Sequence, residues 1–139
     1  MNMMEFSIGM SKSVQKVITK DDTALNYGSG ALKNLLATPT LIALMIEAAV
    51  NTIDPLLPDN YITIGKSIEI EHENPTKEGM TVTVTAKLIE VNGSLLSFEI
   101  IAYDEIGRIG KGHHGRQIVN YDILMKKVDE RLGVLEGRP

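Results

Sequence analysis

The chain has 139 residues with 14 Lys or Arg, 18 Asp or Glu, no Cys and a net charge of −4. This length suits a single domain, residues 1–139. The absence of cysteine excludes thiol catalysis, Cys-ligated metals and disulfides. An acidic chain with four Tyr and two Phe offers no basic stripe for nucleic acid, and no apolar run of about 20 residues could span a membrane. No basic segment precedes an apolar stretch at the N-terminus, so we expect a cytoplasmic protein.

The first half of the chain predicts one edge strand, a loop and one helix. The strand lies within residues 6–19 and the loop covers 20–34. Thr38-Pro39 predicts a helix start, with Thr38 as N-cap and Pro39 at the first helical position. The helix should run to Ile53, before Asp54-Pro55. Its body is apolar on nearly every face, which predicts burial on all sides.

The second half predicts four strands and a short helix. Residues 62–72 alternate, with Ile and His72 on one face and Glu on the other. Further strands are expected at 81–91, 95–103 and 109–121, with an Asn-Gly hairpin joining the second and third of the four. A last helix should cover 122–132, capped by Asp122 and ended by Gly133.

This order of elements indicates an α+β domain in which an antiparallel sheet wraps one helix. One face of a sheet cannot cover a helix on every side. Strong curvature of the sheet or a second subunit must therefore supply the remaining cover, and an obligate dimer is the economical solution.

Three side chains are candidates for chemistry. Glu47 is the only ionisable residue between Pro39 and Val50, and a desolvated carboxylate there suits a general base. Alternatively, Glu47 lies on an exposed rim of the helix. His72 faces inward and could share a pocket with Glu47, or be a core histidine bonded to a carbonyl. Thr38 could serve the site, the helix cap or both.

No metal site is expected. His113 and His114 are adjacent on a strand and point to opposite faces, so they cannot chelate one ion together. The glycines around them have irregular spacing, which indicates close backbone approach or a bulge.

Three segments, in order and at matching spacing, resemble the hot-dog-fold acyl-coenzyme A (CoA) thioesterases. Within that family they look closest to the fluoroacetyl-CoA thioesterase-like group. The resemblance covers roughly residues 6–130. The segments are Leu36-Ala37-Thr38-Pro39 with Ala43 to Ala49; Gly65 to His72, followed by Pro75, Gly79 and Thr81 to Ala86; and Ile109-Gly110-Lys111-Gly112-His113-His114-Gly115-Arg116.

The resemblance implies a long helix wrapped by an antiparallel sheet, with active sites at a dimer interface. It also implies a catalytic Thr, Glu and His with a strand glycine near the thioester. The Thr, His and Gly fall on Thr38, His72 and Gly65. An ungapped match puts the family's glutamate on Ile46, one residue before Glu47 and about 100° around the helix.

We therefore expect a homodimer, or a dimer of dimers, that hydrolyses a small or medium acyl-CoA and needs no cofactor. Glu47 would be nucleophile or general base, His72 would move protons, and Thr38 would orient the carboxylate or the nucleophile. Backbone N–H groups near Gly65 or at the helix start would stabilise the oxyanion. Further substrate-binding candidates are Ile46, His114 and Arg116.

Two other functions stay open. Ile46 at the position of the family's glutamate favours a non-catalytic acyl-CoA binding protein. An enoyl-thioester hydratase ranks last, because the Asp-plus-His motif at the helix start of those enzymes is not evident.

Overall fold

The computed structural model describes residues 6–137. Most of the N-terminal segment on which the cytoplasmic prediction rests lies outside these residues. The structure confirms the predicted α+β architecture. Its strands and helices are β1 (Ser11–Val17), α1 (Thr38–Ile53), β2 (Tyr61–His72), β3 (Thr81–Asn92), β4 (Leu95–Tyr103), β5 (Arg108–Asn120) and α2 (Tyr121–Leu135). Single 3-10 turns lie at Lys20–Asp22, Ala24–Asn26 and Asp54–Leu56.

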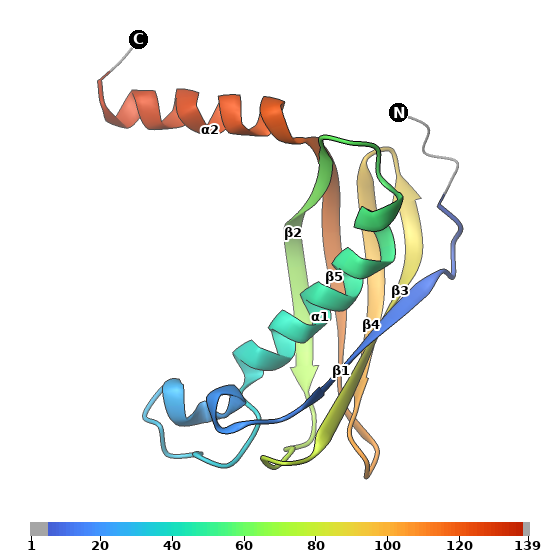
Figure 1. The fold of residues 1–139 in the computed structure, drawn as a ribbon, viewed down its shortest axis with the longest axis vertical. Coiled ribbons are helices and arrows are strands. Elements are labelled where there is room, and N and C mark those ends of the chain that lie inside the picture. The colour runs from blue at the N-terminus through green and yellow to red at the C-terminus, as the bar shows by residue number, and fades with distance from the viewer. Residues whose placement is uncertain (1–5, 138–139) are drawn as a thin grey trace.

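The five strands form one antiparallel sheet in the order β1-β3-β4-β5-β2. The sheet curls around α1, which crosses its concave face (Figure 1). The Asn92-Gly93 turn joins β3 to β4 as predicted, and Gly93 has a φ of 61° that suits a tight hairpin. This order leaves β1 and β2 as the two edges.

Glycines on β5 allow α1 to lie close to the sheet. A Cβ atom at Gly110 would lie 2.8 Å from the Glu71 carbonyl oxygen and 3.2 Å from Leu41 Cδ2. At Gly112 it would lie 2.8 Å from the Glu69 carbonyl oxygen and 3.4 Å from Met45 Sδ. The prediction of close backbone approach is confirmed at these two positions.

Only one side of α1 is covered by the sheet. Its inner face is fully buried and includes Leu41, Met45, Ala48 and Ala49. On its outer face Ala43, Glu47 and Asn51 are exposed, and Ile42, Ile46 and Val50 are half-buried. In the single chain, the prediction of burial on all sides is therefore wrong for this outer face.

Both predicted helix caps are wrong by one or two residues. Ala37 is the N-cap of α1, so Thr38 is the first residue of the helix. Asn120, rather than Asp122, caps α2 by accepting a hydrogen bond from the Ile123 N–H. The second helix also continues past Gly133 to Leu135.

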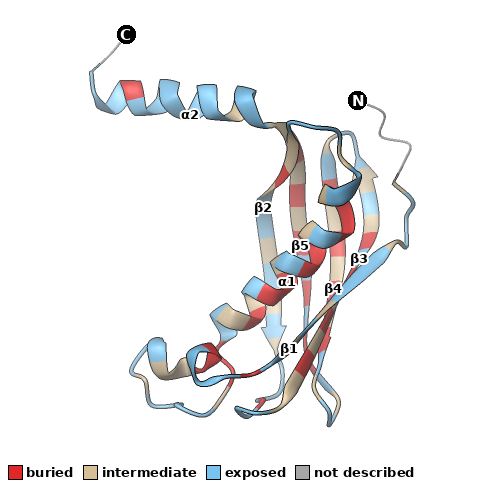
Figure 2. Ribbon diagram, viewed as in Figure 1, coloured by how far each residue is buried: buried red, intermediate tan, exposed pale blue. Residues whose placement is uncertain are grey.

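The C-terminal helix α2 projects from the body and is exposed along most of its length (Figures 1 and 2). Within residues 6–137, no helix is long and apolar enough to cross a membrane. An exposed apolar stripe with 4-3-4-3 spacing runs along α2: Tyr121, Met125, Val128, Leu132 and Leu135.

The alternation in β2 is interrupted by a bulge between Gly65 and Ser67. Lys66 is the extra residue, so the inward face changes from odd to even positions along the strand. Thr63 is therefore buried before the bulge, and His72 faces the helix after it. A strict period of two could not predict this change.

The close approach at β5 predicts that Gly110→Ala lowers the free energy of unfolding by about 1–3 kcal/mol. The added methyl group would meet a backbone carbonyl that cannot move without distorting the β2–β5 ladder. Urea denaturation measures the effect. Gly107→Ala is the matched control, because its Cβ would have nothing within 4 Å. Equal stabilities for the two variants would contradict this packing account.

Candidate active site

Thr38 and His72 come together at the start of α1. The Thr38 Oγ1 and His72 Nδ1 atoms lie 2.8 Å apart, joining the first residue of the helix to the last residue of β2. Thr38 is free for this contact because Ala37, not Thr38, caps the helix. The pair links a hydroxyl to an imidazole beside a helix N-terminus, where developing negative charge is favoured.

The other ring nitrogen of His72 has no partner. Its Nε2 atom is buried and makes no hydrogen bond within the described residues. Burial lowers the pKa of His72, so the neutral ring is favoured. A neutral imidazole with one unused nitrogen can accept or donate a proton as the tautomer changes.

A pocket of about 260 Å³ opens beside this pair. One wall is formed by Thr38, His72 and residues 73–75. The 20–36 loop contributes apolar lining with Ala24, Leu32, Leu35 and Leu36. The pocket is therefore lined both by the polar pair and by aliphatic side chains.

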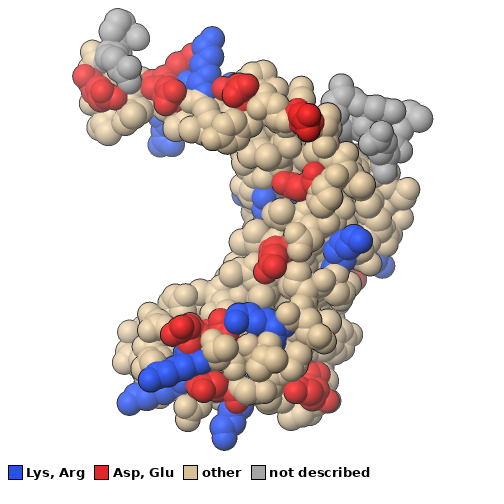
Figure 3. Space-filling view, viewed as in Figure 1, with Lys and Arg blue, Asp and Glu red and all other residues tan. Residues whose placement is uncertain are grey.

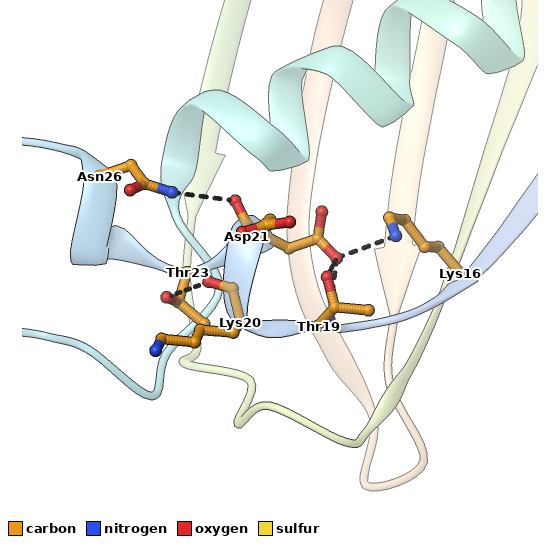
Figure 4. Close-up of polar contacts among 7 residues, drawn as sticks. Lys16, Thr19, Lys20, Asp21, Thr23 and Asn26 are labelled. Atoms are coloured by element: carbon orange, nitrogen blue, oxygen red, sulfur yellow. Dashed lines mark hydrogen bonds and ion pairs between the residues drawn. The ribbon is translucent and has the colours of Figure 1, made fainter.

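Asp22 ties this loop to the body through Thr19 and Lys16, both labelled in Figure 4. Its carboxylate accepts hydrogen bonds from the Thr19 backbone N–H and hydroxyl, and pairs with Lys16 at 2.9 Å. Burial would raise the pKa of Asp22, but the contacts with Thr19 and Lys16 outweigh it and lower the pKa. The Asp22 carbonyl also accepts the Ala37 N–H, which fixes the loop against the start of α1.

A second polar group lies at the other end of β2. Arg116 on β5 is 7% exposed and donates three hydrogen bonds. Its Nε goes to the Thr63 hydroxyl at 2.8 Å, one terminal nitrogen to the Thr63 carbonyl at 2.8 Å, and the other to His114 Nε2 at 3.1 Å. Asp54 accepts from the Thr63 hydroxyl at 2.6 Å and from its backbone N–H at 3.2 Å.

The contacts of His114 define its tautomer. An arginine side chain can only donate, so His114 Nε2 is the acceptor and carries no proton. Nδ1 therefore holds the proton and donates to the Ser67 carbonyl at 2.7 Å. Burial and the nearby charge of Arg116 lower the pKa of His114, outweighing the opposing effect of the Ser67 bond.

Gly65 lies beside the largely buried Arg116 guanidinium and places no side chain against it. A Cβ atom at Gly65 would lie 3.5 Å from an Arg116 terminal nitrogen and 3.7 Å from His114 Cε1. These are ordinary contact distances, so a side chain would fit but would cover both groups. Gly65 is itself exposed, so an exposed backbone position lies next to these two buried side chains.

The candidate residues thus form two groups within one chain. Gly65 and His72 are seven residues apart on β2, about 20 Å along an extended strand. Glu47 joins neither group. It lies about 14 Å along the helix axis from Thr38 and about half a turn around it, and its side chain makes no hydrogen bond or ion pair within residues 6–137. Ile46 is half-buried on the outer part of α1.

Sequence reasoning missed Asp54 and Thr63. Asp54-Pro55 was interpreted only as a helix stop, and the bulge hid the burial of Thr63. The available signal was Thr63, a polar residue between two isoleucines of a strand, a short loop after Asp54 at the end of the helix. Within residues 6–137, no group of three or more His, Cys, Asp or Glu side chains could hold a metal ion.

Comparison with solved structures defines the class as hot-dog proteins. A hot-dog-like protein from Thermanaerovibrio acidaminovorans is 29% identical, with a TM-score of 0.87 over 92% of this chain and 94% of that one. A point mutant of the fluoroacetyl-CoA-specific thioesterase FlK is 28% identical, with a TM-score of 0.84 over 91% and 97%. Another FlK mutant, 27% identical with a TM-score of 0.83 over 91% and 98%, was solved with acetyl-CoA. The predicted hot-dog fold is confirmed.

The sequence comparisons define the family. The family model for fluoroacetyl-CoA-specific thioesterases matches residues 18–122. The fluoroacetyl-CoA thioesterase of Streptantibioticus cattleyicolor is 34% identical over 97 residues, which is 70% of each chain. The chain belongs to the fluoroacetyl-CoA-specific thioesterase family. This confirms the predicted thioesterase family.

The buried His114 and the half-buried His72 predict a loss of stability in acid. Both have a pKa lowered from 6.5, so below that pH the unfolded chain binds protons that the native state resists. Stability is fully present above about pH 6.5 and falls as the pH drops toward the native pKa values. Urea denaturation between about pH 8 and pH 5 should show this, with a smaller decline in His72→Gln. A flat wild-type profile would refute it.

Proposed function

We propose that this protein hydrolyses a small or medium acyl-CoA thioester to the free acid and CoA. The observation that carries the proposal is the Thr38–His72 hydrogen bond at the mouth of a pocket with an apolar wall. Membership of a thioesterase family supports the choice of thioester chemistry. A pocket of about 260 Å³ favours a short or medium acyl chain. A cytoplasmic location belongs to the same proposal.

We propose that the active form is a homodimer, paired through β2 or further assembled as a dimer of dimers. β2 is a 12-residue strand at the sheet edge, with one row of backbone groups unpaired within the sheet. The outer face of α1 lies beside this edge, and Figure 3 shows mainly uncharged atoms across the middle of the molecule. A second copy would cover an apolar helix face and complete the strand pairing at once.

A two-fold dimer supports a shared site. If two copies of β2 pair antiparallel about a two-fold axis between Ile68 and Glu69, Gly65 of one strand lies opposite His72 of the other. The roughly 20 Å between the two groups within one chain would then be bridged by the partner. Thr38 and His72 would come from one subunit, and Gly65 and Arg116 from the other.

In this arrangement, Glu47 would act from an interface rather than from a buried core. It lies exposed on the outer face of α1, which the second copy would cover. Burial there would make the carboxylate a stronger base toward water or a nucleophile toward the thioester. Ile46, one position earlier, would line the acyl side of the same interface.

The proposed chemistry is addition of water to the thioester carbonyl followed by cleavage of the C–S bond. Glu47 would take the proton from water, and His72, oriented by Thr38, would carry that proton to the leaving thiolate of CoA. If Glu47 instead attacks the carbonyl directly, loss of the thiolate leaves a mixed anhydride, which water would hydrolyse in a second step. Backbone N–H groups near Gly65 or at the start of α1 would stabilise the oxyanion. Arg116, beside the side-chain-free position of Gly65, would bind the acyl end.

A non-catalytic acyl-CoA binding protein is the second candidate. The observation in its favour is Ile46, an apolar residue where the ungapped family match expects a carboxylate, with Glu47 outside hydrogen-bond contact in the single chain. Calorimetric binding of acyl-CoA without turnover would favour it. Hydration of an enoyl thioester is a third outcome that a crotonyl-CoA assay would detect.

We expect purified protein to release CoA from at least one member of a panel of acetyl- to octanoyl-CoA. His72→Ala should lower kcat/KM by about 100-fold or more, since it removes the proton-transfer group. His113→Ala is the matched control, because His113 is exposed on the opposite face of β5. Glu47→Gln tests whether Glu47 is catalytic: kcat/KM should fall if it is, and stay unchanged if it is not. Absence of turnover across the whole panel would refute hydrolysis.

The dimer proposal has its own test. Sedimentation equilibrium should give twice the chain mass of 15.2 kDa, or four times if dimers pair. Ile68→Pro should shift the protein to monomer, because proline in an edge strand removes a backbone donor. Ile106→Pro, in an exposed turn, is the comparison. A monomeric wild type at micromolar concentration would overturn the shared site.

A further inference from the structure

Arg116 is a buried cation that forms no direct ion pair with a described residue. It is 7% exposed, and no carboxylate of the described residues forms an ion pair with it. A buried charge without such a partner is costly and persists only when other groups compensate it. The groups that do so are Thr63, Asp54 and His114.

Asp54 acts on Arg116 through one intervening hydroxyl. The Thr63 hydroxyl donates to the Asp54 carboxylate at 2.6 Å, and its oxygen accepts from Arg116 Nε at 2.8 Å. A direct carboxylate–guanidinium pair commonly uses two donors. Because the Thr63 hydroxyl lies between them, Asp54 compensates the charge of Arg116 without occupying its terminal N–H groups.

His114 fixes the other side of the guanidinium. It accepts from the Arg116 terminal nitrogen at 3.1 Å and is itself held by the Ser67 carbonyl at 2.7 Å. The β2 bulge falls between Gly65 and Ser67, where the ladder with β5 is interrupted. With the extra residue Lys66, the Ser67 carbonyl meets His114 while Gly65 stays opposite Arg116.

Three of the five guanidinium N–H groups are thus used, which leaves two without an acceptor among the described residues. The terminal nitrogen bonded to His114 also borders the space above Gly65. We propose that Asp54, Thr63 and His114 are positioning residues that fix Arg116 with two free donors for the substrate at Gly65. This inference rests on the proposed function and assigns His114 to Arg116 rather than to the substrate.

The test compares Thr63→Val with Thr63→Ser. Valine keeps the shape of the side chain but removes the hydroxyl that joins Asp54 to Arg116, whereas serine keeps it. We expect Thr63→Val to raise KM about tenfold or more with kcat changed less than about twofold, because a ground-state contact is lost. Thr63→Ser should stay within about twofold of wild type in both constants.

A second readout does not depend on turnover. Proton exchange of the Arg116 side-chain Nε–H, followed by NMR, should be slow in the wild type compared with exposed Arg131 on α2. Thr63→Val should speed this exchange about tenfold, and Thr63→Ser should preserve it. If Thr63→Val does not fold, the wild-type measurement alone tests the hydrogen bond from Arg116 Nε to Thr63. Rapid exchange of Nε–H in the wild type would then overturn the proposal.

The outcomes separate the two proposals. Equal KM and equal exchange in the valine and serine variants would overturn the positioning role. A loss of activity in Thr63→Val that only matches its unfolded fraction, measured by circular dichroism, would also overturn it. If the wild type hydrolyses no acyl-CoA, the proposed function fails, and the exchange comparison still decides whether Thr63 holds Arg116.

Discussion

The packing of α1 on the concave face of the sheet is the constraint on which the rest of the structure depends. Gly110 and Gly112 have no side chains, so Leu41 and Met45 can lie against the β5 backbone. This contact sets the position of the whole helix. It places Thr38 at hydrogen-bond distance from His72 at one end, and brings Asp54 against Thr63 at the other. Both polar groups are therefore consequences of one apolar packing arrangement.

The same packing leaves half of the helix and one edge of the sheet without cover. Ile42, Ile46 and Val50 lie on the outer side of α1, and β2 has an unpaired edge beside them. The Thr38–His72 pair and the Arg116 group sit at opposite ends of that edge. A single chain holds two incomplete halves of a site, which is why we propose that the functional unit contains two chains.

Much of this could be predicted from local patterns, and the failures have physical causes. Alternation placed His72 on the inner face because nothing interrupts β2 between Ser67 and His72. Thr38 looked like a cap because Thr-Pro is a common helix start, yet the hydroxyl bonds to a histidine 34 residues away. Glu47 looked buried because its neighbours are apolar, but Glu47 itself lies on the outer face of α1, which the sheet does not cover. The Asp54–Thr63–Arg116 contacts depend on a bulge and on residues far apart in sequence, which periodicity does not encode.

The central claim is that each site draws on two subunits, and subunit mixing tests it most directly. His72→Ala and Arg116→Gln proteins, each folded and nearly inactive alone, are mixed under conditions that allow subunits to exchange. Half of the dimers should then be mixed, each with one intact site, so about a quarter of the wild-type activity should appear. Activity that stays at the level of the separate variants, despite proven exchange, would contradict the account.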